Sequence, residues 1–213
     1  MCILSLFRND KEFILTHNRD EDFKRKSSEK LVVKTWNGIE AIFPEDVQAG
    51  GTWILTSNKW TTAILNGAEH FHNRNPPYRH SRGIFPFLLL EYDEIEVFWE
   101  NVNLEEIEPF TQIVINHINN DAFDLKWDGK QKLFRKISEN FFVTSSATLY
   151  SISEKQLHQK TLQKLSPITP DNLSHVHQKL HWKYKSDLPM IKTTSTTQIQ
   201  RNSEFCSVKY ERW

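Results

Sequence analysis

The sequence has little cysteine, no excess of either charge and no long apolar run. Its two cysteines, Cys2 and Cys206, lie near opposite ends of the 213 residues, too few for a disulfide framework. Twenty-seven basic residues balance twenty-seven acidic ones, so electrostatics gives no case for nucleic acid or an anionic membrane as a partner. No apolar segment reaches membrane-spanning length, and the N-terminal run is too short for a secretory signal. These absences predict a cytoplasmic protein without nucleic-acid partners or stable membrane insertion.

Internal repeats and low-complexity linkers are absent too. A chain of 213 residues without such breaks predicts one domain over residues 1–213, which buries roughly 70% of the surface exposed by its unfolded chain. Seven tryptophans and fourteen phenylalanines are many for this length and are expected as large side chains on sheet faces. Nothing in the sequence indicates an oligomeric state.

The first twenty-one residues carry the strongest chemical signal. Two short apolar runs, CILSLF and EFILTH, flank a polar turn at residues 8–11, a pattern typical of a β-hairpin. The first strand starts at Cys2, and the second ends in Asn-Arg-Asp-Glu at residues 18–21. Because the start of one hairpin strand lies beside the end of the other, we expect the Cys2 thiol to neighbour this cluster.

Removal of Met1 would give Cys2 both a thiol and a free α-amine. The thiolate is the nucleophile, and an amine titrating near pH 8, roughly, can take the thiol proton. Arg19 would stabilise the thiolate or an anionic intermediate, and Asp20 or Glu21 would hold the ammonium group. The structural alternative is a buried small residue and a solvated turn, but their occurrence at the two ends of one hairpin favours catalysis.

The remaining pattern alternates groups of strands with groups of helices. Asn37-Gly38 and Asn58-Lys59 predict two further hairpins, and apolar spacing predicts two helices over residues 85–102, broken near Tyr92-Asp93. Strands over residues 109–146 are expected to form a second meander and the second sheet. A capping box at Ser151 and a Thr169-Pro170 pair each predict the start of a helix, and residues 194–213 predict a last hairpin.

Several polar residues admit two interpretations. His70, His72 and His80 lie in a polar loop over residues 68–80; a metal site is weighed there, but no cysteine joins the cluster, and a mobile lid is favoured over any metal. On the helix after Pro170, three histidines predict a solvated face rather than a ligand set, namely His175, His177 and His181. Cys206 is expected to be an inert core thiol.

Five short motifs occur in a recognisable order: Met-Cys at the start, NRDE at residues 18–21, GGTW at 50–53, ILNG at 64–67 and SRG at 81–83. Together they resemble the NRDE-domain family, also called the transport and Golgi organisation protein 2 family. That family is related to N-terminal-nucleophile hydrolases of the choloylglycine hydrolase and penicillin V acylase kind. Weaker matches extend the resemblance to the C-terminus. It implies an α+β fold, a four-layer αββα sandwich of two antiparallel sheets flanked by helices.

The resemblance also extends the candidate site. Asn66 ends a strand where the related hydrolases place an oxyanion donor, and Ser146 lies where they have a second asparagine. The GGTW loop borders the family's pocket. The candidate catalytic residues are therefore Cys2, Arg19, Asp20 and Asn66, and the candidate substrate-binding residues are Asn18, Glu21, Gly51, Thr52, Trp53 and Ser146.

Two functions follow from these residues. The first is an N-terminal-cysteine amidohydrolase that cleaves a C–N amide bond of a small molecule and needs no cofactor or metal. The second is a non-catalytic carrier that holds an apolar metabolite, a lipid or haem, on the same scaffold. In both cases the partner is a small-molecule substrate or ligand.

Overall fold

The computed structural model describes residues 2–181 and 188–213. The chain forms two compact units, and the first is discontinuous in sequence. Unit 1 consists of Met1–Lys26 and Glu139–Trp213, and unit 2 of the intervening Ser27–Ser138. The single domain and the four-layer stacking stay predictions. In the described residues, no helix combines the length and the apolar character needed to cross a bilayer.

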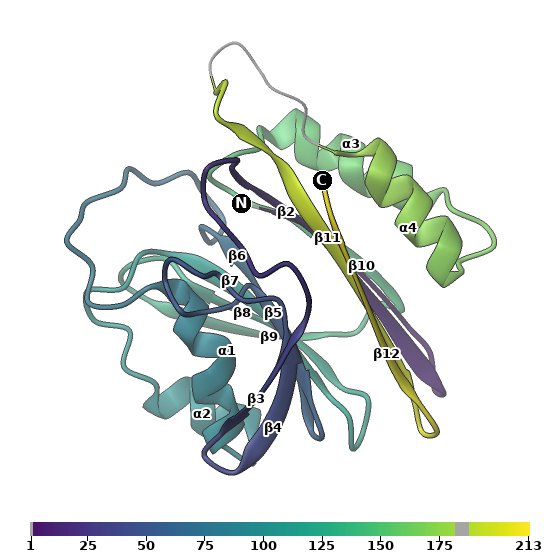
Figure 1. The fold of residues 1–213 in the computed structure, drawn as a ribbon, viewed down its shortest axis with the longest axis horizontal. Helices are drawn as coiled ribbons and strands as arrows, with labels where there is room; N and C mark the ends of the chain where they lie inside the picture. The colour runs from purple at the N-terminus through teal and green to yellow at the C-terminus, as the bar shows by residue number, and fades with distance from the viewer. Residues whose placement is uncertain (1, 182–187) are drawn as a thin grey trace. The chain divides into compact units, whose positions relative to one another are not determined.

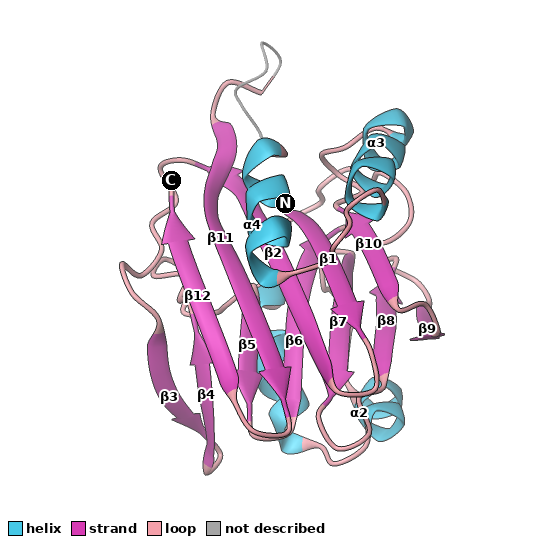
Figure 2. Ribbon diagram, turned by 90° about the vertical axis from the view of Figure 1, so that its right-hand side faces the viewer, coloured by secondary structure: helices cyan, strands magenta, loops and turns pink. Residues whose placement is uncertain are grey.

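Unit 1 is an antiparallel sheet in which N-terminal strands lie beside the yellow C-terminal strands (Figure 1). Its five strands have the order β10-β1-β2-β11-β12, which can be followed in Figure 2. Its central pair is the predicted N-terminal hairpin, and its other strands come from the C-terminal third. The second hairpin strand continues to Asp22, so the NRDE residues lie within a strand and not in a turn. The strands are β1 (Cys2–Arg8), β2 (Glu12–Asp22), β10 (Phe141–Ser145), β11 (Ile191–Asn202) and β12 (Cys206–Arg212).

Two helices of unit 1 lie on one face of this sheet (Figure 2). Helix α3 (Ile152–Gln163) packs against β10, and α4 (Pro170–Lys179) packs against β2 and β11. Both predicted starts are confirmed, since Ser151 forms a capping box and Thr169 caps the helix that opens with Pro170. A core of Ile3, Ile14, Leu149, Tyr150, Leu162 and Leu173 lies between helices and sheet.

Unit 2 is an antiparallel sheet of seven strands that follow one another in chain order. Its first hairpin turns at Asn37 and Gly38, whose φ angles of 47° and 84° are the left-handed values that a two-residue turn requires. The strands are β3 (Val32–Trp36), β4 (Ile39–Phe43), β5 (Ile54–Ser57), β6 (Trp60–Asn66), β7 (Phe110–Asn116), β8 (Ala122–Trp127) and β9 (Lys132–Ile137).

The predicted second meander is divided between the units, which corrects the expectation that it forms the second sheet. β7 pairs with β6 along its whole length and so extends the first meander, whereas β10 pairs with β1 in unit 1. Alternation of apolar residues identifies a strand and its faces, but it does not determine which free edge the strand joins.

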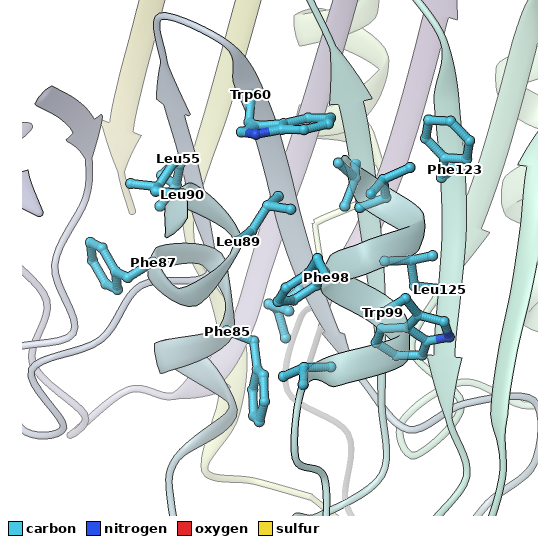
Figure 3. Close-up of a cluster of buried hydrophobic side chains, with 14 of the residues drawn as sticks. Leu55, Trp60, Phe85, Phe87, Leu89, Leu90, Phe98, Trp99, Phe123 and Leu125 are labelled. Atoms are coloured by element: carbon cyan, nitrogen blue, oxygen red, sulfur yellow. The ribbon is translucent and has the colours of Figure 1, made fainter. Parts of the chain in front are cut away.

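The helical segment of unit 2 packs its aromatic side chains over this sheet (Figure 3). It comprises η1 (Arg82–Ile84), α1 (Phe85–Leu88), η2 (Leu89–Glu91) and α2 (Ile95–Asn101), and the predicted break is confirmed at Tyr92, which is extended. Lys132 stabilises the end of α2, because its Nζ donates to the carbonyls of Trp99, Glu100 and Val102 at 2.6, 2.9 and 2.7 Å.

Candidate active site around Cys2

Strand register brings Cys2 beside the NRDE residues. Cys2 pairs directly with Arg19, so their side chains lie on the same face of the unit 1 sheet, and alternation places Glu21 there as well. Asn18 and Asp20 point to the opposite face, which α3 and α4 cover. The predicted proximity is confirmed, but the four NRDE side chains divide between two faces.

The Cys2 side chain is buried, with 3% of the residue exposed. Burial raises the pKa of its thiol, the nearby charge of Asp20 raises it further, and Arg19 lowers it. The Ser146 N–H donates to the Cys2 carbonyl at 2.9 Å. Ser146, predicted to bind substrate, therefore contacts Cys2 through its backbone, and its Oγ lies 3.1 Å from the Thr148 hydroxyl.

Arg19 is held from two sides. Its Nη1 donates to Thr194 Oγ1 at 3.3 Å, and that hydroxyl donates to the Arg19 carbonyl at 3.1 Å. Thr194 can reach back in this way because β11 has a bulge between Thr193 and Ser195. Arg19 Nη2 lies 4.0 Å from Glu21 Oε2. Burial raises the pKa of Glu21, but nearby positive charges, Arg19 among them, together with the Asp22 N–H hold that pKa below its ordinary value.

Asp20 is a fully buried carboxyl group with a hydroxyl donor at each oxygen. Tyr150 donates to Oδ2 and Thr193 donates to Oδ1, both at 2.6 Å. Burial raises the pKa of Asp20 to about 6, although both hydrogen bonds act in the opposite direction. Sequence reasoning missed Tyr150 and Thr193, which lie 130 and 173 residues from Asp20; no local spacing could have indicated them.

Asn18 joins the sheet to α4. Its Nδ2 donates to the His177 carbonyl at 2.8 Å, and its Oδ1 accepts from Thr196 Oγ1 at 2.9 Å and faces His177 Nδ1 at 3.2 Å. Nδ1 therefore carries the imidazole proton, and Nε2 accepts from Ser5 Oγ at 2.8 Å. Both ends of the Asn18 amide are engaged in the protein, an arrangement that favours a structural role over substrate binding.

His177 corrects the prediction of a solvated helix face. The residue is fully buried, and burial lowers its pKa to about 3, so the ring is neutral at physiological pH. Cys206 also departs from its prediction as a core thiol. It is exposed, because β12 is an edge strand of the sheet.

The remaining candidates belong to unit 2. Gly51 lies against Gly83, where a Cβ atom on Gly51 would approach the Gly83 backbone to 2.8 Å, and Thr52 N–H donates to Gly83 O at 3.0 Å. The Thr52 hydroxyl donates to the Pro44 carbonyl at 2.7 Å. Close backbone approach thus accounts for Gly51 of the GGTW motif and Gly83 of the SRG motif. Trp53 is buried, and Asn66 ends β6 half-buried.

Electrostatic contacts anchor the polar loop over residues 68–80. Glu108 is almost fully buried and lies 3.5 Å from His72 Nε2, 3.2 Å from Arg74 Nε and 3.3 Å from Arg82 Nη2. Within residues 2–181 and 188–213, no three histidine, cysteine or carboxylate side chains are grouped as a metal site requires. His72 and Arg74 therefore hold the loop against Glu108.

Comparison with known proteins adds one finding. A family model described as Transport and Golgi organisation 2 matches residues 1–209, which span nearly all of both units. No curated protein matches the sequence significantly.

Proposed function

The chain belongs to the Transport and Golgi organisation 2 family, and from this membership and the geometry around Cys2 we propose that it is an amidohydrolase with an N-terminal cysteine nucleophile. Removal of Met1 creates the nucleophile, and the substrate is a small molecule with a C–N amide bond. The resemblance to N-terminal-nucleophile hydrolases of the choloylglycine hydrolase kind supports this proposal. The reaction needs no cofactor.

The observation that carries the proposal is the environment of Asp20. A buried carboxyl group with a pKa near 6 is largely ionised at pH 7, in surroundings that disfavour its charge. Among the described residues, no basic side chain forms an ion pair with Asp20. An α-ammonium on Cys2, whose strand partner Arg19 adjoins Asp20, would supply the compensating positive charge. A residue that destabilises the folded state, as ionised Asp20 does, is characteristic of a functional site.

The reaction then follows from the groups present. The α-amine of Cys2 takes the thiol proton, and the sulfur attacks the amide carbonyl to give a tetrahedral oxyanion. Arg19, on the same face, stabilises negative charge there. The C–N bond breaks as the ammonium group returns its proton to the leaving amine, and water hydrolyses the resulting thioester. Asn66 as an oxyanion donor stays a prediction.

One observation favours the second candidate, a carrier that binds an apolar metabolite. Burial raises the pKa of the Cys2 thiol, whereas a nucleophilic thiol normally has a lowered one. A protein that only holds its ligand has no need of a thiolate.

The two functions are distinguished by mass spectrometry and turnover. We expect the intact mass of the native protein to lack Met1, and an acyl probe to label Cys2 much faster than the exposed Cys206. Cys2→Ala should abolish amide hydrolysis while the protein stays folded. Retained Met1, or hydrolysis that persists in Cys2→Ala, would refute the proposed mechanism. A co-purified lipid or pigment that is unaffected by Cys2→Ala would favour the carrier.

A further inference from the structure

Two hydroxyl groups of β11 share the face that carries Cys2. Ser195 pairs with Arg19, which pairs with Cys2, so these three side chains form one row across the sheet. Thr197 pairs with His17 in the next row on the same face. Thr196, between them, points to the opposite face, where it bonds Asn18.

Both hydroxyls are buried without a partner. Ser195 and Thr197 are fully buried, and among the residues that the structure describes neither Oγ forms a hydrogen bond. An unpaired buried hydroxyl destabilises a folded protein relative to an apolar group of the same shape. Both residues lie inside β11, and although Ser195 borders the bulge, neither hydroxyl bonds the backbone there, so the strand does not account for either hydroxyl.

We propose that Ser195 and Thr197 bind the polar end of the substrate whose amide bond Cys2 attacks, an inference that rests on the proposed function. The two residues then act as substrate-binding and specificity-determining groups. A hydroxyl can donate or accept a hydrogen bond without adding charge. The group that it recognises is therefore a neutral hydroxyl, amide or carbonyl, with which each side chain can exchange a hydrogen bond.

The register sets the size of this substrate. Neighbouring strands are about 4.8 Å apart, so Ser195 lies about 10 Å from Cys2 across two strand spacings, and Thr197 lies about 7 Å further along the strand. An extended peptide covers about 10 Å in three residues. The substrate class is thus a small amide, of roughly di- to tripeptide length, with a neutral hydrogen-bonding group at the end remote from the scissile bond.

Binding can be measured without turnover. In the Cys2→Ala protein, calorimetry would compare ω-hydroxyoctanamide with nonanamide, which has a methyl group in place of the hydroxyl. We expect the hydroxyamide to bind about tenfold more tightly than nonanamide, a difference in affinity that corresponds to roughly one hydrogen bond. Adding Ser195→Ala and Thr197→Val should remove this preference while leaving nonanamide binding unchanged.

Stability provides the matched control. Because their hydroxyls are unpaired, Ser195→Ala and Thr197→Val should leave the urea midpoint unchanged or raise it. Thr196→Val, on the same strand, should lower it, since Thr196 donates to Asn18 at 2.9 Å and accepts from Trp213 Nε1 at 3.1 Å.

Three outcomes would overturn the inference: a hydroxyamide preference that survives both substitutions, no binding of either amide, or a loss of stability equal to that of Thr196→Val. Failure of the proposed function is a separate result. It would appear as wild-type protein that binds these amides with the expected preference and does not hydrolyse them.

Discussion

In protein that keeps Met1, and so lacks the compensating α-ammonium of Cys2, replacing Asp20 by asparagine should increase stability at neutral pH. The Asp20 carboxyl is fully buried, and its pKa is raised from the ordinary 3.8 to about 6. Between these two values the folded state binds more protons than the unfolded state, so stability falls as pH rises through this window. Above it, ionised Asp20 costs about 3 kcal/mol. Asparagine keeps the shape and avoids this charge, and it can still bond the Tyr150 and Thr193 hydroxyls.

The assay is urea unfolding of wild type and Asp20→Asn between pH 3.5 and 8. We expect the variant to be more stable by about 2–3 kcal/mol at pH 7.5, with the difference shrinking below pH 6 and vanishing near pH 4. In the processed protein, the proposed amide hydrolysis should in contrast be lost in the variant. Asp124→Asn is the control and should lower stability at neutral pH, because buried Asp124 pairs with Lys126 at 3.5 Å and Arg135 at 3.3 Å. An Asp20→Asn protein that is less stable at pH 7.5, or whose advantage does not change with pH, would contradict the reasoning.

Three further predictions concern stability measured by the same urea unfolding. Gly51→Ala should destabilise by about 2–4 kcal/mol, because its methyl group would overlap the Gly83 backbone, while Gly38→Asn, which has open space around it but a φ angle of 84°, should cost only about 1 kcal/mol of backbone strain. Asn18→Ala should cost about 3 kcal/mol, since the Thr196 hydroxyl and the His177 Nδ1–H lose their acceptor and the His177 carbonyl loses one donor inside the protein; a cost below about 1 kcal/mol would mean that α4 does not depend on this contact. Lys132→Met should cost about 1–2 kcal/mol, because three carbonyls at the end of α2 lose their charged donor, and an unchanged midpoint would show that water replaces it.

Local signals in the sequence predicted the elements well. The apolar runs on either side of residues 8–11 identified β1 and β2, and the proximity of Cys2 to the NRDE residues followed from hairpin geometry alone. Ser151, Thr169-Pro170 and Asn37-Gly38 each mark a backbone requirement satisfied within a few residues. Such features depend only on near neighbours, which a sequence displays directly.

Long-range contacts were not predictable in the same way. Asp20 meets Tyr150 and Thr193, and His177 meets Asn18, only because strands from the two ends of the chain share a sheet. The sequence showed that Asp20 neighbours Cys2 but not that it points to the helix-covered face. It likewise could not tell that β7 would extend the sheet of β6, since a free strand edge is a property of the fold.

The discontinuity of unit 1 has a consequence for the order of synthesis. β1 and β2 leave the ribosome first, but their partners β10 and β11 begin at Phe141 and Ile191. At roughly 5–20 residues per second, the rest of the chain takes about 10–40 s to appear. During that interval the five-stranded sheet that buries Cys2 cannot form, and the N-terminus of the nascent chain stays open to an aminopeptidase. The topology thus leaves time for the removal of Met1, on which the proposed mechanism depends, before folding encloses Cys2.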